Sequence, residues 1–231
     1  RTVLTVEGGV TTVRTSLAPA IEKVVDEIVT NAIDHRIRDP KMASLRVSID
    51  DAGAIFVTND GSETIPTAAW PGTSVPTPQV LFHELHSGSN LDDAKRKAVG
   101  GRNGVGATVT NYLSKWFVVH LCNAAEGVEY TQRFEDNGAV VHAPLVQKYR
   151  GKTCKTSISF LPDYERFGCA VPLSAETLAL LKGRAMDAAA CTAAQVYVNG
   201  TKLPMRSLKQ YAAAFGGTQQ LGCDATIDDV H

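Results

Sequence analysis

One long amphipathic stretch constrains the fold of this chain more than any other feature. Residues 16–40 read SLAPAIEKVVDEIVTNAIDHRIRDP, in which Ser16 is a candidate N-cap, Pro19 suits a first turn and Pro40 lies beyond the end. The apolar residues recur at helical spacing and are Leu17, Ile21, Val24, Val25, Ile28, Val29, Ala32 and Ile33. We therefore predict a helix that buries one broad face and exposes the other.

The rest of the chain predicts strands, with a second helix near the end. LRVSID and AIFVT, joined by a short turn, predict a hairpin. KWFVVHLCN, VEYTQRFE, AVVHAPLV and TSISFLP follow at hairpin spacing and predict an antiparallel meander. A helix near SAETLALLKGRAMDAAA then leads to AQVYVNGTKLP, a strand with an Asn-Gly turn.

Composition narrows the classes of protein that fit. The chain has 231 residues, of which 44% are hydrophobic, so one domain with a substantial core is expected. A formal net charge of −1 gives no bulk attraction for nucleic acid or an anionic membrane. No apolar run is long enough for a membrane span, and no signal peptide is visible at the amino terminus.

Five cysteines are widely spaced and contain no CxxC pair. This pattern argues against both a disulfide framework and a zinc site, and it favours an intracellular compartment. The chain begins at Arg1 and ends in the polar stretch CDATIDDVH, so we expect it to be a piece of a longer protein.

The segment GGRNGVGATVTNYLS, residues 100–114, is rich in glycine and runs into a possible helix. A P-loop would need lysine where Ala107 stands, and a dinucleotide fingerprint would need a third glycine where Val109 stands. Glycines still let backbone amides approach an anion at a helix N-terminus. The segment alone leaves two interpretations open, an anion-binding loop and a flexible surface turn.

Glu27 and Asn31 are four residues apart and so share one face of the predicted helix. A carboxylate that orients water and an amide oxygen that holds Mg²⁺ would need about that separation. An ordinary solvated helix face is the alternative. Residues 59–102 are rich in Gly, Pro, Ser and Thr, and a connection this long is typical of a functional loop such as a lid.

Together, DEIVTNAIDH, VTNDGSETIP, HSGSNLDD and GGRNGVGATVTN resemble the ATPase domain of type IIA DNA topoisomerases, in the eukaryotic or large-virus form. RDPKMASLRVSID, VPLSAETLALL and VYVNGTKLP extend the resemblance over most of residues 10–205. It implies the α/β Bergerat (GHKL) fold, a two-layer sandwich in which helices cover a mixed, mostly antiparallel sheet, with a long ATP-lid loop. Residues 1–215 would form this ATP-binding domain, and 216–231 a polar segment leading toward a transducer domain.

The resemblance also assigns site residues. It implies that Glu27 is the general base, that Asn31 is the Mg²⁺ ligand and that Asn59 contacts adenine. Ser89 and Asn90 would contact ribose or phosphate. The other residues implied to line the nucleotide are Gly61, Ile65, Gly101, Arg102, Asn103, Gly104, Val105 and Gly106.

Several positions depart from the family pattern. NDGSETIP lacks the second glycine of the usual loop, and Gly88 replaces a serine. Thr108 stands where lysine is usual, and its hydroxyl can still donate a hydrogen bond to phosphate. His35 stands where a second asparagine is common, so a phosphate contact there would depend on pH.

The resemblance implies an ATP-hydrolysing domain that uses ATP and Mg²⁺ and dimerises as a gate around DNA in the full enzyme. It implies no membrane partner, no DNA-cleavage site in this chain, and a location in a nucleus or at a viral replication site. Hydrolysis by this chain alone is expected to be weak, because the family senses the γ-phosphate through a transducer lysine. Two alternatives stay open, another GHKL ATPase and a nucleotide-binding dimerisation module with little hydrolysis.

Overall fold

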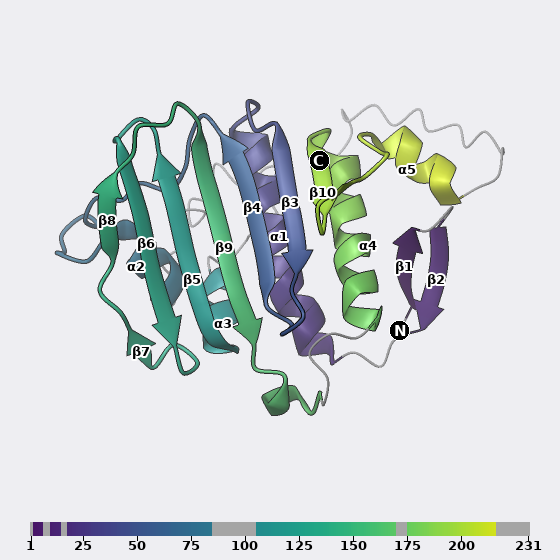
Figure 1. The fold of residues 1–231 in the computed structure, drawn as a ribbon, viewed down its shortest axis with the longest axis horizontal. Helices are drawn as coiled ribbons and strands as arrows, with labels where there is room; N and C mark the ends of the chain where they lie inside the picture. The colour runs from purple at the N-terminus through teal and green to yellow at the C-terminus, as the bar shows by residue number, and fades with distance from the viewer. Residues whose placement is uncertain (1, 7–9, 15–17, 85–104, 170–174, 216–231) are drawn as a thin grey trace, which may run out of the picture.

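The structure, a computed structural model, describes residues 2–6, 10–14, 18–84, 105–169 and 175–215 (Figure 1). Its strands are β1 Thr2–Val6, β2 Val10–Arg14, β3 Ser44–Ile49, β4 Ile55–Gly61, β5 Ser114–Asn123, β6 Val128–Glu135, β7 Val140–Val141, β8 Leu145–Lys148, β9 Cys154–Pro162, β10 Gln195–Val198 and β11 Thr201–Lys202. Its helices are α1 Pro19–Arg38, α2 Thr77–His83, α3 Gly106–Tyr112, the short 3-10 helix η2 Glu165–Phe167, α4 Ala175–Thr192 and α5 Leu208–Phe215.

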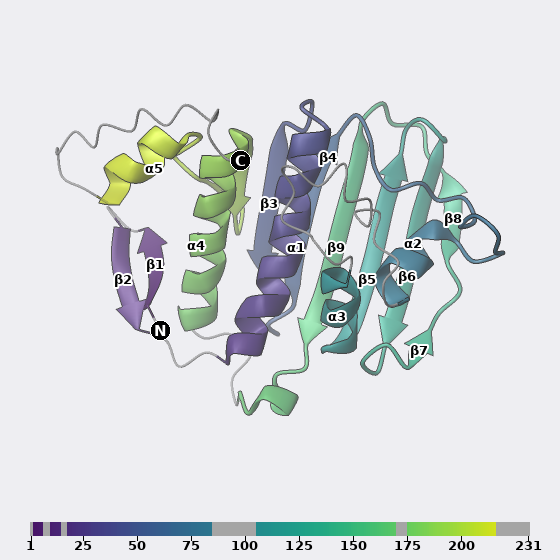
Figure 2. The ribbon, with the colours of Figure 1, turned by 180° about the vertical axis from the view of Figure 1, so that it is seen from behind.

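Nine strands form one mixed sheet in the order β11-β10-β3-β4-β9-β5-β6-β7, with β8 also paired to β6. Neighbouring strands are antiparallel except β10 and β3, which are parallel. Helices α1, α2 and α3 lie on one face of this sheet, and the opposite face carries no described helix (Figures 1 and 2). The predicted two-layer α/β sandwich is therefore confirmed.

Helix α1 provides the centre of the helical layer. Its apolar face is buried as predicted, with Val25 and Ile28 at most 2% exposed. It packs over strand residues that alternate along the sheet, since every second side chain of a strand points to the same face. Leu45, Val57 and Phe117 belong to that same buried cluster. Each such side chain contributes about 1.5–3 kcal/mol relative to an exposed one, so this interface stabilises the position of α1.

The ends of α1 confirm part of the prediction. Pro19 occupies the first turn and the helix ends at Arg38, before Pro40. The N-cap position belongs to Ala18, however, so the prediction that Ser16 caps the helix is wrong. Proline at the first helical position has no N–H to leave unpaired, and its fixed φ angle suits the start of a helix.

The predicted meander is wrong in its strand order. β9 leaves the edge formed by β6 and β8 and inserts between β4 and β5. This central position buries Ile158 and Phe160 on the helical side. AVVHAPLV is also not one strand, since it divides into β7 and β8 with Pro144 between them. Proline cannot donate to a ladder, which is consistent with a break at that point.

Other elements were predicted correctly or missed. The β3–β4 hairpin and helix α4 are confirmed, and so is the Asn-Gly turn, in which Asn199 and Gly200 have φ values of 46° and 80°. The β1–β2 hairpin, α5 and the helix α2 inside the segment expected to be irregular were not predicted. Over the described ranges, no helix is long and apolar enough to cross a membrane.

Candidate functional site

The site is built where α1, the start of α3 and the end of β4 meet. Gly106 begins α3 and lies against Glu27 of α1. A Cβ atom on Gly106 would stand only 1.8 Å from Glu27 Oε2 and 2.5 Å from its Cδ. Glycine is therefore the residue type that permits this approach, and the close contact places Gly106 beside the predicted general base.

Lys23 holds the other oxygen of the Glu27 carboxylate. Its Nζ lies 2.5 Å from Glu27 Oε1 and 3.7 Å from Asp26 Oδ2. The hydrogen bond to Glu27 is the largest cause of a raised pKa for the Lys23 ammonium. The Glu27 side chain is 24% exposed, so water can still reach it. Lys23 was not predicted from the sequence, although its four-residue spacing from Glu27 was a visible signal.

Asn31 lies one helical turn beyond Glu27 and is exposed, with its amide available to a ligand in solvent. One amide oxygen suits Mg²⁺, which takes few protein ligands and keeps phosphate oxygens and waters for the rest. The donor set therefore fits the predicted role. That role stays a prediction.

His35 lies a further turn along α1 and faces the end of β4. Its Nε2 is buried and has no hydrogen-bond partner among the described residues. A Cβ on Gly61 would lie 2.8 Å from this nitrogen and 2.5 Å from Asp39 Oδ2, so the loop after β4 passes directly beside both side chains. Asp39 Oδ2 lies 3.7 Å from this nitrogen, beyond hydrogen-bond distance, so the nitrogen can still make a hydrogen bond to a ligand.

Asp39 anchors that loop. Its carboxylate accepts hydrogen bonds from the backbone N–H groups of Lys41, Ser62 and Glu63 at 3.0, 2.6 and 3.1 Å, and from the Ser62 hydroxyl at 2.9 Å. Burial alone would raise the pKa of the Asp39 carboxyl, but the donors from Ser62, Lys41 and Glu63 outweigh it and lower that pKa. Asp39 is thus a positioning residue for NDGSETIP that the sequence analysis did not identify.

Asn59 occupies the buried face of β4, together with Ile55 and Val57. In register it lies between Leu45 of β3 and Thr156 of β9. The Thr156 hydroxyl is 2.7 Å from that of Thr64 in the loop after β4. This places Asn59 on the helical side of the sheet, as an adenine contact requires, and adds Thr156 as a polar neighbour that the sequence analysis missed. Ile65 is half-buried and packs against the core.

Thr108 does not face the site with its hydroxyl. Its side chain is fully buried, and its Oγ1 donates to the backbone carbonyls of Leu81 at 3.2 Å and Glu84 at 3.4 Å. The expectation of a phosphate contact by this hydroxyl is therefore corrected, because the group already satisfies carbonyls at the end of α2. Thr108 instead ties α3 to α2.

The remaining predicted residues divide into two groups. Val105 is the N-cap residue of α3, and the first amides of a helix have no partner within it. Six predicted contacts lie outside the described residues, namely Ser89, Asn90, Gly101, Arg102, Asn103 and Gly104.

The environment of His35 predicts a pH-dependent stability. Burial lowers the pKa of His35, with Asp39 opposing this and Arg38 reinforcing it, while Glu63 and Asp60 also oppose it. Just below about pH 6.5, the His35 imidazole therefore binds a proton in the unfolded chain but stays neutral in the folded chain. The stability that neutral His35 contributes is therefore fully present above this pH. It is lost as the pH falls toward the lower pKa that His35 has in the folded chain.

Denaturant unfolding between about pH 7 and about pH 5 measures this effect, with a slope of up to about 1.4 kcal/mol per pH unit. His35→Asn should flatten the dependence in that window. Ile37→Ala, at an exposed position of the same helix without a titratable group, is the matched control and should keep the wild-type profile. An unchanged profile in His35→Asn would contradict the burial of a neutral imidazole.

Comparison with known proteins gives one consistent group of relatives. No family model matches the chain. It is 36% identical over 203 residues to DNA topoisomerase 2 of Pisum sativum, which covers 87% of the chain and 14% of that protein. It is 33% identical over 202 residues to DNA topoisomerase 2 of Saccharomyces cerevisiae, covering 87% and 14%. DNA topoisomerase 2 of Acanthamoeba polyphaga mimivirus is 34% identical over 198 residues, covering 85% and 15%.

Solved structures agree with these relatives. The ATPase region of Saccharomyces cerevisiae topoisomerase II has a TM-score of 0.87 at 31% identity, over 93% of this chain and 57% of that one. The ATPase and transducer domains of DNA topoisomerase II from Balamuthia mandrillaris have a TM-score of 0.87 at 33% identity, over 93% and 56%. The chain thus spans 14–15% of the length of the sequence relatives above.

Proposed function

The chain is an ATPase domain of the type IIA DNA topoisomerase family with the GHKL fold, and on that premise we propose that it binds and hydrolyses ATP with Mg²⁺. The observation that carries this proposal is the approach of Gly106 to Glu27, where the start of α3 lies against a carboxylate with no room for a Cβ. A helix start beside a water-accessible carboxylate combines amide donors for phosphate with a base for the attacking water.

Each site residue has a separate proposed role that depends on its position. Glu27 accepts a proton from water, while Lys23 fixes one of its oxygens and Gly106 limits the space for the other. Asn31 offers its amide oxygen to Mg²⁺, which when bound would offset phosphate charge. Deeper in the site, Asn59 with Gly61 and Ile65 would receive the adenine.

Two sets of groups would contact the phosphates, the His35 side chain and the backbone at the start of α3. His35 Nε2 would contact the phosphates, since it is buried and makes no hydrogen bond among the described residues, with Asp39 Oδ2 3.7 Å away. The backbone of Val105 and Gly106 would approach the triphosphate, together with Ser89, Asn90 and the segment 101–104 proposed from the family resemblance. Electrostatic positioning by these groups then supplies most of the catalysis, as is usual for phosphoryl transfer.

The relatives, which are DNA topoisomerases of plant, yeast and viral origin, support a role for this chain within a longer protein. We propose that ATP makes two copies dimerise as a gate for DNA, and that hydrolysis reopens it, in a nucleus or at a viral replication site. Residues 1–215 would form the ATP-binding unit and 216–231 would lead toward a transducer. DNA contacts would come mainly from other parts, because this chain has a formal net charge of −1.

A second function is favoured by one observation, the ion pair between Lys23 and Glu27 at 2.5 Å. Because Lys23 occupies one oxygen of the Glu27 carboxylate, that oxygen is less available to water. This arrangement suits a nucleotide-binding dimerisation module with little hydrolysis. Phosphate release from a longer protein that includes the transducer separates the two functions. Turnover that depends on Glu27 supports the enzyme, whereas tight binding without turnover supports the module.

Asn31→Ala tests the proposed Mg²⁺ ligand. Because the variant removes the amide oxygen, we expect the affinity for a non-hydrolysable ATP analogue in Mg²⁺ to fall about tenfold or more. Affinity without Mg²⁺ should change little, which fluorescence anisotropy with a labelled analogue measures. Ile37→Ala, at another exposed position of α1, is the matched control. An Asn31→Ala protein with the full Mg²⁺ dependence would show that Asn31 is not the ligand.

A further inference from the structure

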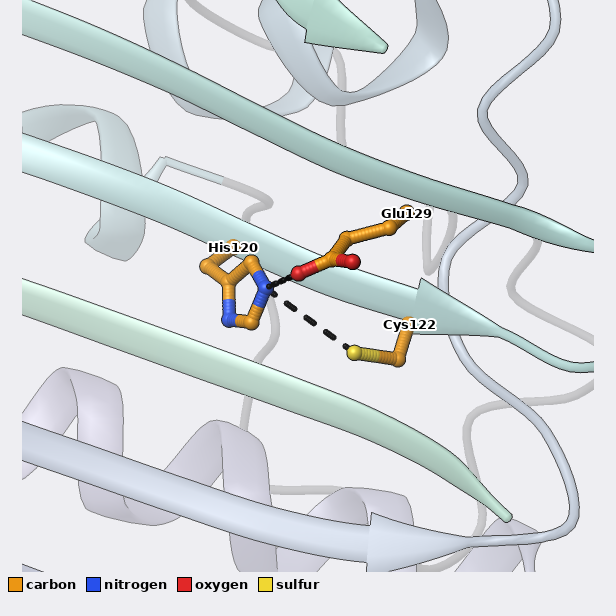
Figure 3. A group of neighbouring side chains, drawn as sticks. All are labelled: His120, Cys122 and Glu129. Atoms are coloured by element: carbon orange, nitrogen blue, oxygen red, sulfur yellow. Dashed lines mark hydrogen bonds and ion pairs between the residues drawn. The ribbon is translucent and has the colours of Figure 1, made fainter. Parts of the chain in front are cut away.

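Three side chains of different chemistry gather on the sheet face that carries no described helix. His120 and Cys122 lie two residues apart on β5, so both point to the same face. Glu129 of β6 is directly opposite Cys122 in the strand register. Between them along β5, Leu121 points the other way into the core. Figure 3 shows the imidazole, thiol and carboxylate turned toward one another.

The distances among these groups are short. His120 Nε2 lies 2.8 Å from Glu129 Oε1 and 3.9 Å from Cys122 Sγ. One ligand atom from each residue lies within 4.8 Å of the other two. Cys122 is only 5% exposed, whereas the His120 and Glu129 side chains are each 36% exposed. The group therefore has a buried sulfur at its base and an open side toward solvent.

We propose that His120, Cys122 and Glu129 bind a zinc ion, with solvent at the fourth position. Zinc accepts thiolate, imidazole and carboxylate ligands at bond lengths near 2.0–2.3 Å in tetrahedral geometry. Such bonds place neighbouring ligand atoms about 3.4–3.6 Å apart. The observed 2.8 and 3.9 Å lie on either side of this range, and the third pair, Cys122 Sγ and the Glu129 carboxylate, lies within 4.8 Å. Shifts of up to about 1 Å at the side-chain ends therefore bring all three pairs into range.

The chemistry of the ligands favours zinc over the cation of the nucleotide site. Thiolate is a soft ligand that selects zinc, whereas Mg²⁺ takes oxygen ligands. Cys122 binds zinc as the thiolate, so its buried thiol releases a proton when the metal enters. Together with the Glu129 carboxylate, the thiolate then gives the divalent cation two anionic ligands.

The supporting strands hold the ligands in place. β5 lies between β9 and β6 in the sheet, so both strands that carry ligands are paired along their length. This rigid backbone reduces the ordering cost of forming the site. The absence of CxxC pairs argued against zinc at the level of sequence, but pairing between neighbouring strands brings in Glu129, which linear spacing does not reveal. The site is separate from the proposed nucleotide site, because it occupies the opposite face of the sheet.

Titration with Co²⁺ tests the proposal, since Co²⁺ bound to thiolate in a tetrahedral site absorbs visible light strongly. The metal-free full chain is expected to bind one equivalent of Co²⁺ with this absorption, and Zn²⁺ should displace it. Cys122→Ser should abolish the absorption. His120→Ala and Glu129→Gln should weaken binding about tenfold or more.

A matched control is built into the same sheet. His142 Nε2 and Glu135 Oε2 are also 2.8 Å apart, but they are not part of a three-ligand group among the described residues. His142→Ala and the exposed Cys191→Ser should therefore bind Co²⁺ like the wild type. Circular dichroism checks that each variant folds, and Glu129→Gln, at a half-exposed position, serves if Cys122→Ser does not. The proposal is overturned if no stoichiometric absorption develops, or if folded Cys122→Ser or Glu129→Gln retains wild-type binding.

Discussion

Glu27→Gln is expected to lower the rate of ATP hydrolysis by a factor of about 10²–10⁴ while nucleotide binding is retained. Glutamine keeps the shape of the side chain beside Gly106 but cannot accept a proton from the attacking water. The measurement is phosphate release in a single turnover, with protein in excess of ATP, alongside anisotropy with a labelled analogue. Any intrinsically slow rate of this chain then affects wild type and variant equally.

Glu165→Gln is the control for that variant. The Glu165 side chain is 84% exposed and pairs with Lys115, and both residues are far from Glu27 in the sequence. It should hydrolyse ATP at the wild-type rate. Equal turnover by Glu27→Gln and wild type would contradict the role of Glu27 as general base.

Gly106→Ala is expected to reduce hydrolysis by a factor of about 10² or more, although alanine is the better helix former by up to about 1 kcal/mol. The new Cβ would lie 1.8 Å from Glu27 Oε2, so the carboxylate must move away from its position. A displacement of about 1 Å in a catalytic group is enough for a loss of this size. The same single-turnover assay measures it, with thermal unfolding as a check on the fold.

Val109→Ala is the matched substitution in the same helix, at a position that is 38% exposed. It should leave hydrolysis within about twofold of wild type, since surface substitutions of this kind have small effects. If Gly106→Ala hydrolyses ATP as fast as Val109→Ala, the contact between α3 and Glu27 has no part in catalysis.

The fold was predictable where the pattern is local. The apolar spacing of α1, the β3–β4 hairpin and the turn at Asn199 and Gly200 each follow from residues close in sequence. Strand neighbours were not predictable in the same way, because alternation shows which face a strand buries but not which strand lies beside it. The insertion of β9 between β4 and β5 is an example, because it pairs strands that are far apart in the sequence.

The candidate site likewise has features that local spacing predicts and features that depend on tertiary packing. Glu27, Asn31 and His35 share a helix face, so their relation could be read from spacing. The contact of Gly106 with Glu27 and the anchoring of the loop by Asp39 depend on tertiary packing. The error at Thr108 has the same origin, since its hydroxyl donates to the carbonyl of Leu81, in an element that the sequence did not predict as helical.

Calorimetric titration of the unmodified chain with a non-hydrolysable ATP analogue tests the central claim most directly. With Mg²⁺ present, the account predicts one analogue per chain at micromolar or tighter affinity, equivalent to about −8 kcal/mol or more. Omitting Mg²⁺ should weaken the binding measurably, since Asn31 would hold the metal and the metal would offset phosphate charge. The absence of binding heat at millimolar analogue, with or without Mg²⁺ and at two temperatures, would contradict the assignment of a nucleotide site between α1, α3 and β4.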